Sequence, residues 1–172
     1  MKAQDLIHEK SELTNGKLGP EPIVLSTRIR LARNLEGFNF PDWSSVEKRI
    51  EVLDLCAKEI KDLSVLENAE EFDCEDMTEI EKGMLVERHL ISPEFAQKGE
   101  GSGVIINKEQ SVSVMINEED HLRIQVLRNG YQFKSAWQAI DELDNQIDAR
   151  LDYAFSGQLG YLTACPTNLG TG

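Results

Sequence analysis

Cysteine, histidine and long apolar runs are scarce in this sequence, and each scarcity excludes a class of protein. The 172 residues include three cysteines and three histidines. Cys56, Cys74 and Cys165 lie far apart, form no CxxC pair and have no neighbouring histidine, so we expect reduced thiols and no protein-bound metal. No segment is long and apolar enough to span a membrane, and residues 1–17 lack the apolar core of a signal peptide. We therefore expect a cytoplasmic protein without a membrane partner.

Basic residues are also few. The sequence has 18 lysines and arginines against 31 aspartates and glutamates, which gives a formal net charge of -13. Such a chain repels polyanions, which argues against nucleic-acid binding, so any anion that it binds needs a local cluster of basic residues. With 40% hydrophobic residues the composition is typical of a globular chain, and the length suits one domain with its own core.

The apolar pattern predicts an α+β fold with an antiparallel sheet. After a short helix and a lead-in rich in glycine and proline, within about the first 20 residues, four runs have strand composition: residues 22–32, 103–108, 111–117 and 121–127. A short turn around Glu109 and Gln110 joins the second and third runs, which is typical of an antiparallel meander.

Two segments have helical periodicity. In residues 42–63 apolar side chains recur at helical spacing, and Ser44 with Glu47 predicts a capping box. Residues 67–81 hold eight acidic side chains, which predict a solvated loop or an exposed helix face. In residues 132–155 one apolar stripe is predicted to face the core, and it comprises Phe133, Ala136, Trp137, Ile140, Leu143, Ile147, Leu151, Ala154 and Phe155.

Three consecutive carboxylates, Glu118, Glu119 and Asp120, separate two β-branched runs in the stretch SVSVMINEEDHLRIQVL. An unpaired charge inside a sheet costs several kcal/mol, so we expect a cation to meet them. If the stretch is one extended strand, its large apolar residues at even positions share one face, and Glu119 and Arg123 share the polar face about 13 Å apart at ~3.3 Å per residue. A ligand with a cationic and an anionic end would fit that row. The alternative is an edge hairpin whose turn carries the three acids.

Arginines are concentrated in the stretch STRIRLARN. Arg28 and Arg30 share one face of a predicted strand, and two neighbouring guanidinium groups suit phosphate oxygens because each binds bidentately and keeps its proton. Alternatively, they are exposed strand arginines that pair with nearby acids.

Two single residues are further candidates. His89 could add a hydrogen-bond donor, although a lone histidine is also common as a packing or capping residue. Cys165 precedes Pro166 and a glycine-rich segment, where the Thr167 hydroxyl would lie near the thiol and lower its pKa; the alternative is an inert thiol. The segment GYLTACPTNLGTG lacks the lysine of a Walker A loop.

Four blocks, STRIRLARN, HLISP, NEEDHLRIQ and GYLTACPTNLGTG, together resemble the ATP:guanido phosphotransferase (phosphagen kinase) family. They are most similar to the bacterial protein-arginine kinases of that family, from about Ile23 to the last residue. The resemblance implies a glutamine-synthetase-like catalytic domain, in which helices flank an antiparallel sheet. Residues 1–22 would be a lead-in, and residues 23–172 the amino-terminal portion of this domain, incomplete at its carboxyl end.

The resemblance also implies site residues. Those implied to bind ATP, whose phosphates would hold Mg²⁺, are Ser26, Thr27, Arg28, Ile29, Arg30, His89 and Arg123. Glu119 would orient a substrate guanidinium and help to remove its proton, and Cys165 would lie beside that guanidinium. A protonated guanidinium is a poor nucleophile, so its phosphorylation needs such a carboxylate together with cations around the phosphoryl group.

The implied activity is ATP-dependent phosphorylation of arginine side chains in proteins, and this 172-residue chain alone would be inactive. A kinase for a small guanidino metabolite and a non-catalytic binding or regulatory fragment are the alternatives. Small-molecule members carry a helical domain before the S-x-R-x-R block, whereas 25 residues precede it here. The implied partners are proteins with exposed arginine, an activator, and a protease or chaperone system of protein quality control and the stress response. The full-length form would be a homodimer.

Overall fold

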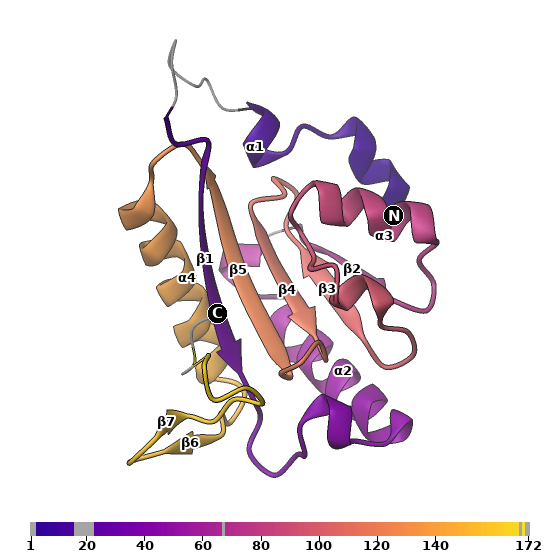
Figure 1. The fold of residues 1–172 in the computed structure, drawn as a ribbon, viewed down its shortest axis with the longest axis vertical. Helices are drawn as coiled ribbons and strands as arrows, with labels where there is room; N and C mark the ends of the chain where they lie inside the picture. The colour runs from indigo at the N-terminus through magenta and orange to yellow at the C-terminus, as the bar shows by residue number, and fades with distance from the viewer. Residues whose placement is uncertain (1–2, 16–22, 67, 169, 171–172) are drawn as a thin grey trace.

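A five-stranded antiparallel sheet organises this computed structural model, which describes residues 3–15, 23–66, 68–168 and 170 (Figure 1). The strands are β1 (Ser26–Arg33), β2 (Glu70–Asp73), β3 (Gly103–Ile106), β4 (Val112–Ile116) and β5 (Leu122–Asn129). Their order in the sheet is β1-β5-β4-β3-β2. The predicted meander is confirmed as β3-β4-β5, and β1 lies at one edge, paired with β5.

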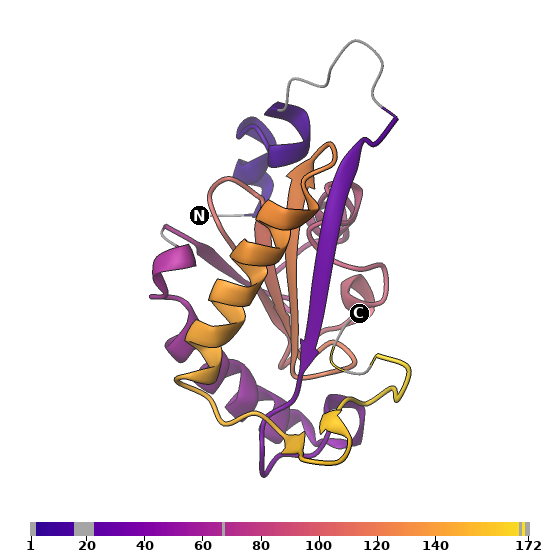
Figure 2. The ribbon, with the colours of Figure 1, turned by 90° about the vertical axis from the view of Figure 1, so that its left-hand side faces the viewer.

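Helices lie on both faces of the sheet (Figures 1 and 2). The α-helices are α1 (Glu12–Asn15), α2 (Val46–Ile60), α3 (Glu79–Glu87) and α4 (Phe133–Asp148). The 3-10 helices are η1 (Ala3–His8), η2 (Pro41–Trp43), η3 (Ser64–Leu66) and η4 (Phe95–Gln97). A small ribbon of β6 (Phe155–Ser156) and β7 (Gly160–Tyr161) follows α4. The predicted α+β class is therefore confirmed. Among the described residues, no helix combines the length and apolar composition that crossing a membrane requires.

One face of the sheet is mainly apolar, because side chains alternate as the sequence pattern predicts. The even-numbered residues of β4 and β5 in this cluster are Val112, Val114, Ile116, Leu122, Ile124 and Val126. The residues that α4 adds are Ala136, Ile140, Leu143 and Ile147. α2 contributes Leu53, Cys56 and Ile60 to the same cluster, so two helices cover this face.

A second and smaller cluster covers part of the opposite face. Leu6 of η1 and Leu85 of α3 share it with Val104, Ile106 and Met115 of the sheet. No described residue of β1 belongs to it. The β1 side of this face therefore has no apolar cover in the part of the chain that the structure describes.

The prediction for the last helix is wrong beyond Asp148. The chain leaves the helix because it pairs instead with the segment after β1: the Ala154 N–H donates to the Asn34 carbonyl at 2.7 Å, and the Glu36 N–H to the Asp152 carbonyl at 2.9 Å. The predicted stripe is buried in its central part, whereas Phe133, Trp137 and Phe155 are exposed. Backbone pairing between distant segments cannot be recognised in a helical period.

The predicted capping box of α2 is also wrong. The helix begins one residue later, at the N-cap Ser45, whose side chain accepts from the Lys48 N–H at 3.4 Å. The Ser44 hydroxyl instead donates to the Asn39 carbonyl at 2.9 Å. Adjacent serines both satisfy the pattern, and the turn made by η2 decides which one caps.

The acidic segment is more ordered than expected. Glu70–Asp73 forms β2, paired with β3, and Phe72 is buried there, so the prediction of a solvated loop or helix face is wrong for these residues. A complete capping box between Thr78 and Glu81 begins α3. At the amino terminus the predicted short helix corresponds to η1 and α1, while the predicted lead-in at residues 16–22 lies outside the described residues.

Candidate functional site

The three carboxylates lie in the turn between β4 and β5. The Asn117 N–H donates to the His121 carbonyl at 2.9 Å, so residues 117–121 form a tight turn and not an extended strand. The predicted spacing of about 13 Å at ~3.3 Å per residue is therefore wrong. Arg123 Nη2 lies 3.3 Å from Glu119 Oε2. The turn is the charged hairpin of the alternative interpretation, but its strands are central in the sheet and not at an edge.

Arg123 is the cation that meets the three carboxylates. Its Nε donates to Glu118 Oε2 at 3.0 Å, and its Nη2 lies 3.3 Å from Glu119 Oε2. The same Nη2 lies 3.9 Å from Asp120 Oδ2. Since an arginine keeps its proton in a folded protein, this buried guanidinium balances the acidic turn from within the chain.

The three carboxylates differ in burial. Side-chain exposure is 8% for Glu118, 45% for Glu119 and 0% for Asp120. Glu118 also accepts a hydrogen bond from the Ser92 hydroxyl. Glu119 has its Oε2 within 3.4 Å of Asn168 Nδ2, while no described residue donates a hydrogen bond to its Oε1. Glu119 is therefore the most exposed acid of this turn.

Arg28 and Arg30 lie on the same face of the sheet as Arg123. The antiparallel register pairs Arg30 with Gln125, two residues from Arg123 on β5, and residues paired across antiparallel strands share a face. Within the described residues, neither Arg28 nor Arg30 forms an ion pair. Burial lowers the pKa of Arg30, and the positive charges of Arg28 and Arg123 lower it further, against weaker support from Glu118 and Glu94. A bound anion would relieve this repulsion.

An open cleft of about 480 Å³ lies over this face. The residues that line it are Arg30, Asp42, Ser92, Glu94, Lys98, Glu118, Glu119, Arg123 and Asn168. Lys98 Nζ forms an ion pair with Asp42 Oδ1 at 2.7 Å across the cleft. The site can therefore receive both an anion, at the arginines, and a cation, at Glu119.

The other candidates on β1 lie differently. Thr27 and Ile29 point to the opposite face: the Thr27 hydroxyl donates to the Gly130 carbonyl at 2.7 Å, and Ile29 packs against the apolar cluster. Their side chains are therefore separated from the cleft by the sheet. Ser26 is exposed at the start of β1.

His89 is exposed just after α3, with a φ of 60°. Its carbonyl accepts from Gln125 Nε2 at 2.6 Å, and Gln125 is the partner of Arg30 in the sheet. The histidine backbone is thus tied to the arginine-bearing strands, although His89 is not among the residues that line the cleft.

Cys165 is partly exposed in the segment of residues 162–168, which we term the cysteine loop. Its Sγ lies 2.8 Å from the Thr167 hydroxyl, the predicted neighbour. The loop reaches the cleft through Asn168. Cys56 and Cys74 are buried, and burial raises the pKa of each thiol to about 12.

Sequence reasoning missed Asn34, Ser92 and Asn168 as residues of the site, and it gave Glu118 and Asp120 no roles of their own. The contacts that bring the three missed residues to the acidic turn span 26 or more positions along the chain. Spacing along the sequence contains no signal for such pairs.

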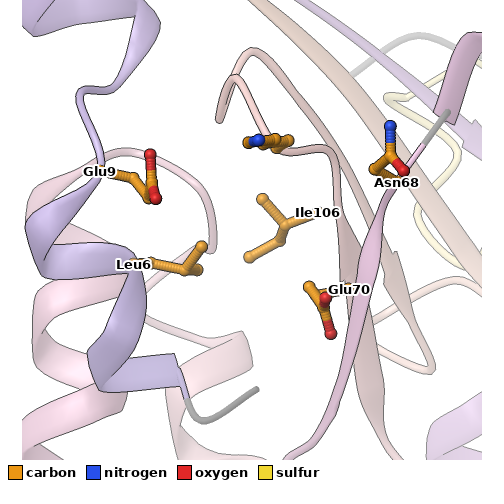
Figure 3. Close-up of a pocket in the computed structure, with 6 residues that line it drawn as sticks. Leu6, Glu9, Asn68, Glu70 and Ile106 are labelled. Atoms are coloured by element: carbon orange, nitrogen blue, oxygen red, sulfur yellow. The ribbon is translucent and has the colours of Figure 1, made fainter.

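A second cavity of about 290 Å³ lies near the edge of the sheet that is formed by β2, away from β1. Figure 3 shows Leu6 and Ile106 facing one another across it, with Glu9 and Glu70 nearby. None of the predicted site residues lines this cavity, and it lies beside β2 and β3 and not beside β1. The cleft at Arg30 is therefore the candidate site.

A sheet that presents arginines beside an exposed carboxylate suits a phosphoryl transfer to a cationic acceptor, and the comparison with known families agrees. The family model described as "ATP:guanido phosphotransferase, C-terminal catalytic domain" matches residues 51–172, and the chain belongs to this family. The predicted family resemblance is thereby confirmed.

Two curated relatives carry the name protein-arginine kinase. The protein of Halothermothrix orenii is 45% identical over 100% of this chain and 49% of its own length. That of Shouchella clausii is 46% identical over 87% of this chain and 42% of its own length. The chain thus spans about half the length of the curated relatives that it matches.

Solved phosphagen kinases share the fold. The taurocyamine kinase of Schistosoma mansoni with bound transition-state analogue components is 28% identical, with a TM-score of 0.82 over 98% of this chain and 25% of that one. A lombricine kinase is 25% identical, with a TM-score of 0.73 over 94% of this chain and 50% of that one. The predicted phosphagen-kinase catalytic fold is confirmed by both.

Proposed function

We propose that this chain provides one wall of the active site of a kinase that transfers the γ-phosphoryl group of ATP to arginine side chains of proteins. The observation that carries the proposal is the placement of Arg28, Arg30 and Arg123 on one face, where Arg30 and Arg123 line a cleft together with Glu119. The names of the most similar curated relatives support a protein substrate.

The phosphates of ATP would bind at Arg28, Arg30 and Arg123. The residues present fit an anion, since Arg28 and Arg30 have no ion-pair partner among the described residues and the pKa of Arg30 is lowered by burial and by its cationic neighbours. Mg²⁺, held through the phosphates, would neutralise part of their charge. Three further residues of β1 would contribute to ATP binding through their backbone atoms or by fixing the position of the strand: Ser26, Thr27 and Ile29. His89 would contribute through its position beside Gln125.

Glu119 would receive the substrate guanidinium. Its free Oε1 can align one nitrogen and accept its proton, while Oε2 stays with Arg123. In the proposed reaction this nitrogen forms a bond to the γ-phosphorus, the bond from that phosphorus to the bridging oxygen of ADP breaks, and Glu119 takes the proton. Cys165 would lie beside the guanidinium, presented by the cysteine loop.

Protein substrates, a protein activator, a protease or chaperone partner, dimerisation of the full-length protein and a cytoplasmic location are proposed from the family resemblance. A kinase for a small guanidino metabolite is the second candidate, and the fold of the taurocyamine and lombricine kinases favours it. Identities of 45% and 46% to protein-arginine kinases favour the first.

The test uses a chimaera in which the carboxyl-terminal half of the Halothermothrix orenii kinase continues the chain after Gly172. With ATP and an arginine-rich protein we expect acid-labile phosphoarginine. Glu119→Gln should lower turnover by about 10²–10⁴ and spare ATP binding, because the amide keeps the shape but cannot accept the proton. Glu142→Gln, on the exposed side of α4, is the control.

Two outcomes would change the conclusion. Phosphorylation of free arginine but not of protein arginine would move the assignment to a metabolite kinase. Full turnover by Glu119→Gln would remove this residue from the chemistry.

A further inference from the structure

A buried polar pair joins three separate segments at the edge of the site. Asn34, just after β1, is 2% exposed, and Asp120, in the acidic turn, is 0% exposed. Asn34 Nδ2 donates to Asp120 Oδ1 at 2.6 Å and to the Leu162 carbonyl at 3.0 Å. The same Asp120 oxygen accepts the backbone N–H of Ala164 at 2.7 Å. The pair therefore ties β1 and the acidic turn to the beginning of the cysteine loop.

The far end of the loop is tied to the same turn. Asn168 Nδ2 lies 3.5 Å from Asp120 Oδ2 and 3.4 Å from Glu119 Oε2. Between the two attachments the loop closes on itself, since the Cys165 carbonyl accepts from the Thr163 hydroxyl at 2.8 Å and from the Asn168 N–H at 3.0 Å. Cys165 thus sits between two points that Asp120 fixes.

Asp120 can fix the loop firmly because its charge is buried. A buried carboxylate needs its hydrogen-bond donors, because losing one donor destabilises the folded state by the desolvation free energy that the bond had offset. Arg123 Nη2 lies 3.9 Å from Asp120 Oδ2 and balances part of this charge. His121 is its chain neighbour, and the His121 N–H is taken by Asn34 Oδ1 at 2.9 Å. The Ala164 N–H therefore belongs to one hydrogen-bond network with Asp120, Asn34 and His121.

We propose that Asn34 and Asp120 are positioning residues that hold the cysteine loop against the acidic turn and so set the location of the Cys165 thiol relative to Glu119. Neither residue is placed to touch a substrate: Asp120 is fully buried, and neither is among the residues that line the cleft. The consequence for phosphoryl transfer rests on the proposed function, whereas the control of the thiol position does not.

The thiol itself reports on the proposal. Cys165 is partly exposed while Cys56 and Cys74 are buried, so iodoacetamide applied to the native chain modifies Cys165 selectively. Asp120→Asn removes the charge and should speed this alkylation about tenfold, the factor expected from loss of one hydrogen bond to a charged group. Ala164→Pro removes the loop N–H and fixes φ at this position, leaves Asn34 and Asp120 in place, and should have a similar effect. Asp141→Asn, an exposed aspartate of α4, is the matched control and should change nothing.

A double-mutant cycle separates positioning from a general loss of stability. If Asn34→Ala and Asp120→Asn loosen the loop through one network, the double variant should react no faster than the faster single variant. Unchanged alkylation in both Asp120→Asn and Ala164→Pro, with melting curves showing folded protein, would overturn the proposal. If Asp120→Asn does not fold, Ala164→Pro decides alone.

The catalytic consequence has its own readout in the chimaera. Asp120→Asn should lower kcat while the KM for ATP stays close to that of the parent. Altered thiol reactivity in a chimaera without any kinase activity would contradict the proposed function and leave the positioning role standing. Unaltered reactivity in an active chimaera would contradict the positioning role alone.

Discussion

The two faces of the central sheet differ in the side chains that they carry and in how far helices cover them. The face under α2 and α4 is a continuous apolar cluster that includes Ile124 and Ile140. On the other face, α3 and η1 cover only the part formed by β2, β3, β4 and the end of β5, and at β1 the surface holds Arg28 and Arg30 instead. The same strands therefore contribute to the stability of the fold through one face and present positive charge on the other. Stability derived from one face allows the other to hold like charges close together.

The largest expected effect comes from placing a charge on the covered face. Ile124→Asp would bury an unpaired carboxylate under α4, at a cost of several kcal/mol, comparable with the whole stability of a domain, about 5–15 kcal/mol. We expect no cooperative thermal transition in circular dichroism. Arg28→Asp, which puts the same side chain on the exposed side of β1, should melt almost as the parent does. A normal transition in Ile124→Asp would show that the two faces are not so different.

The next effect concerns the ion pair between Arg123 and Glu118, which belongs to the partly covered face. Arg123→Leu leaves Glu118 buried without its cation and should lower the free energy of unfolding by about 3–5 kcal/mol, measured by urea denaturation. The double variant with Glu118→Leu should recover part of this loss. If the double variant is less stable than Arg123→Leu, the pair is not the source of the cost.

A pH dependence is expected at the base of the acidic turn. His121 Nδ1 accepts the Leu35 N–H at 3.0 Å, so its ring must be neutral, and burial lowers its pKa despite the opposing effects of the hydrogen bond to Asn39 and the charge of Asp120. The neutral form is favoured by folding. Stability should therefore be complete above the unfolded pKa of about 6.5, fall as the pH drops below it, and level off below the folded pKa.

Melting temperatures between about pH 5 and 7.5 measure this slope, in the range where an unperturbed histidine titrates. His121→Gln, which keeps one donor and one acceptor, should flatten it, while His89→Gln, at an exposed histidine, should not. An equal slope in the parent and in His121→Gln would assign the dependence to other groups.

The smallest expected effect is at a helix that covers part of the charged face. Thr78 caps α3 with a complete capping box. Thr78→Ala should cost about 1 kcal/mol of unfolding free energy, because one N–H at the helix start loses its acceptor. Ser44→Ala, at the serine that does not cap α2, provides a comparison and should cost less. Equal losses of unfolding free energy in the two variants would mean that the Thr78 cap contributes no more to stability than a serine that caps no helix.

The sequence predicts the periodic parts of the molecule well. Alternation in β4 and β5 places Ile116 and Leu122 correctly, and the meander follows from it. It fails where distant segments decide the outcome, as when residues 152–154 pair with the segment after β1 and do not continue the last helix. Adjacent candidates such as Ser44 and Ser45 are likewise resolved only by the preceding turn.

The candidate site divides in the same way. Arg28 and Arg30 share a face as their parity predicts, because strands keep a strict period of two, and the register between β1 and β5 puts Arg123 on the same face. Glu119 reaches Arg123 for a different reason, since the turn brings them to 3.3 Å. The roles of Asn34 and Asp120 depend on contacts that span 86 positions, which no local pattern contains.

Strand β1 is anchored at both ends, by the Thr27 hydroxyl to the Gly130 carbonyl and by Asn34 to Asp120. The number of residues between these anchors is therefore constrained. One inserted residue would break one of the two anchors, exchange the polar and apolar faces of part of the strand, or force a bulge into it. Over evolutionary time such a strand can exchange residue types more easily than it can gain or lose a position. In a search for distant relatives, an ungapped match across residues 27–34 is thus more informative than the number of identities within it.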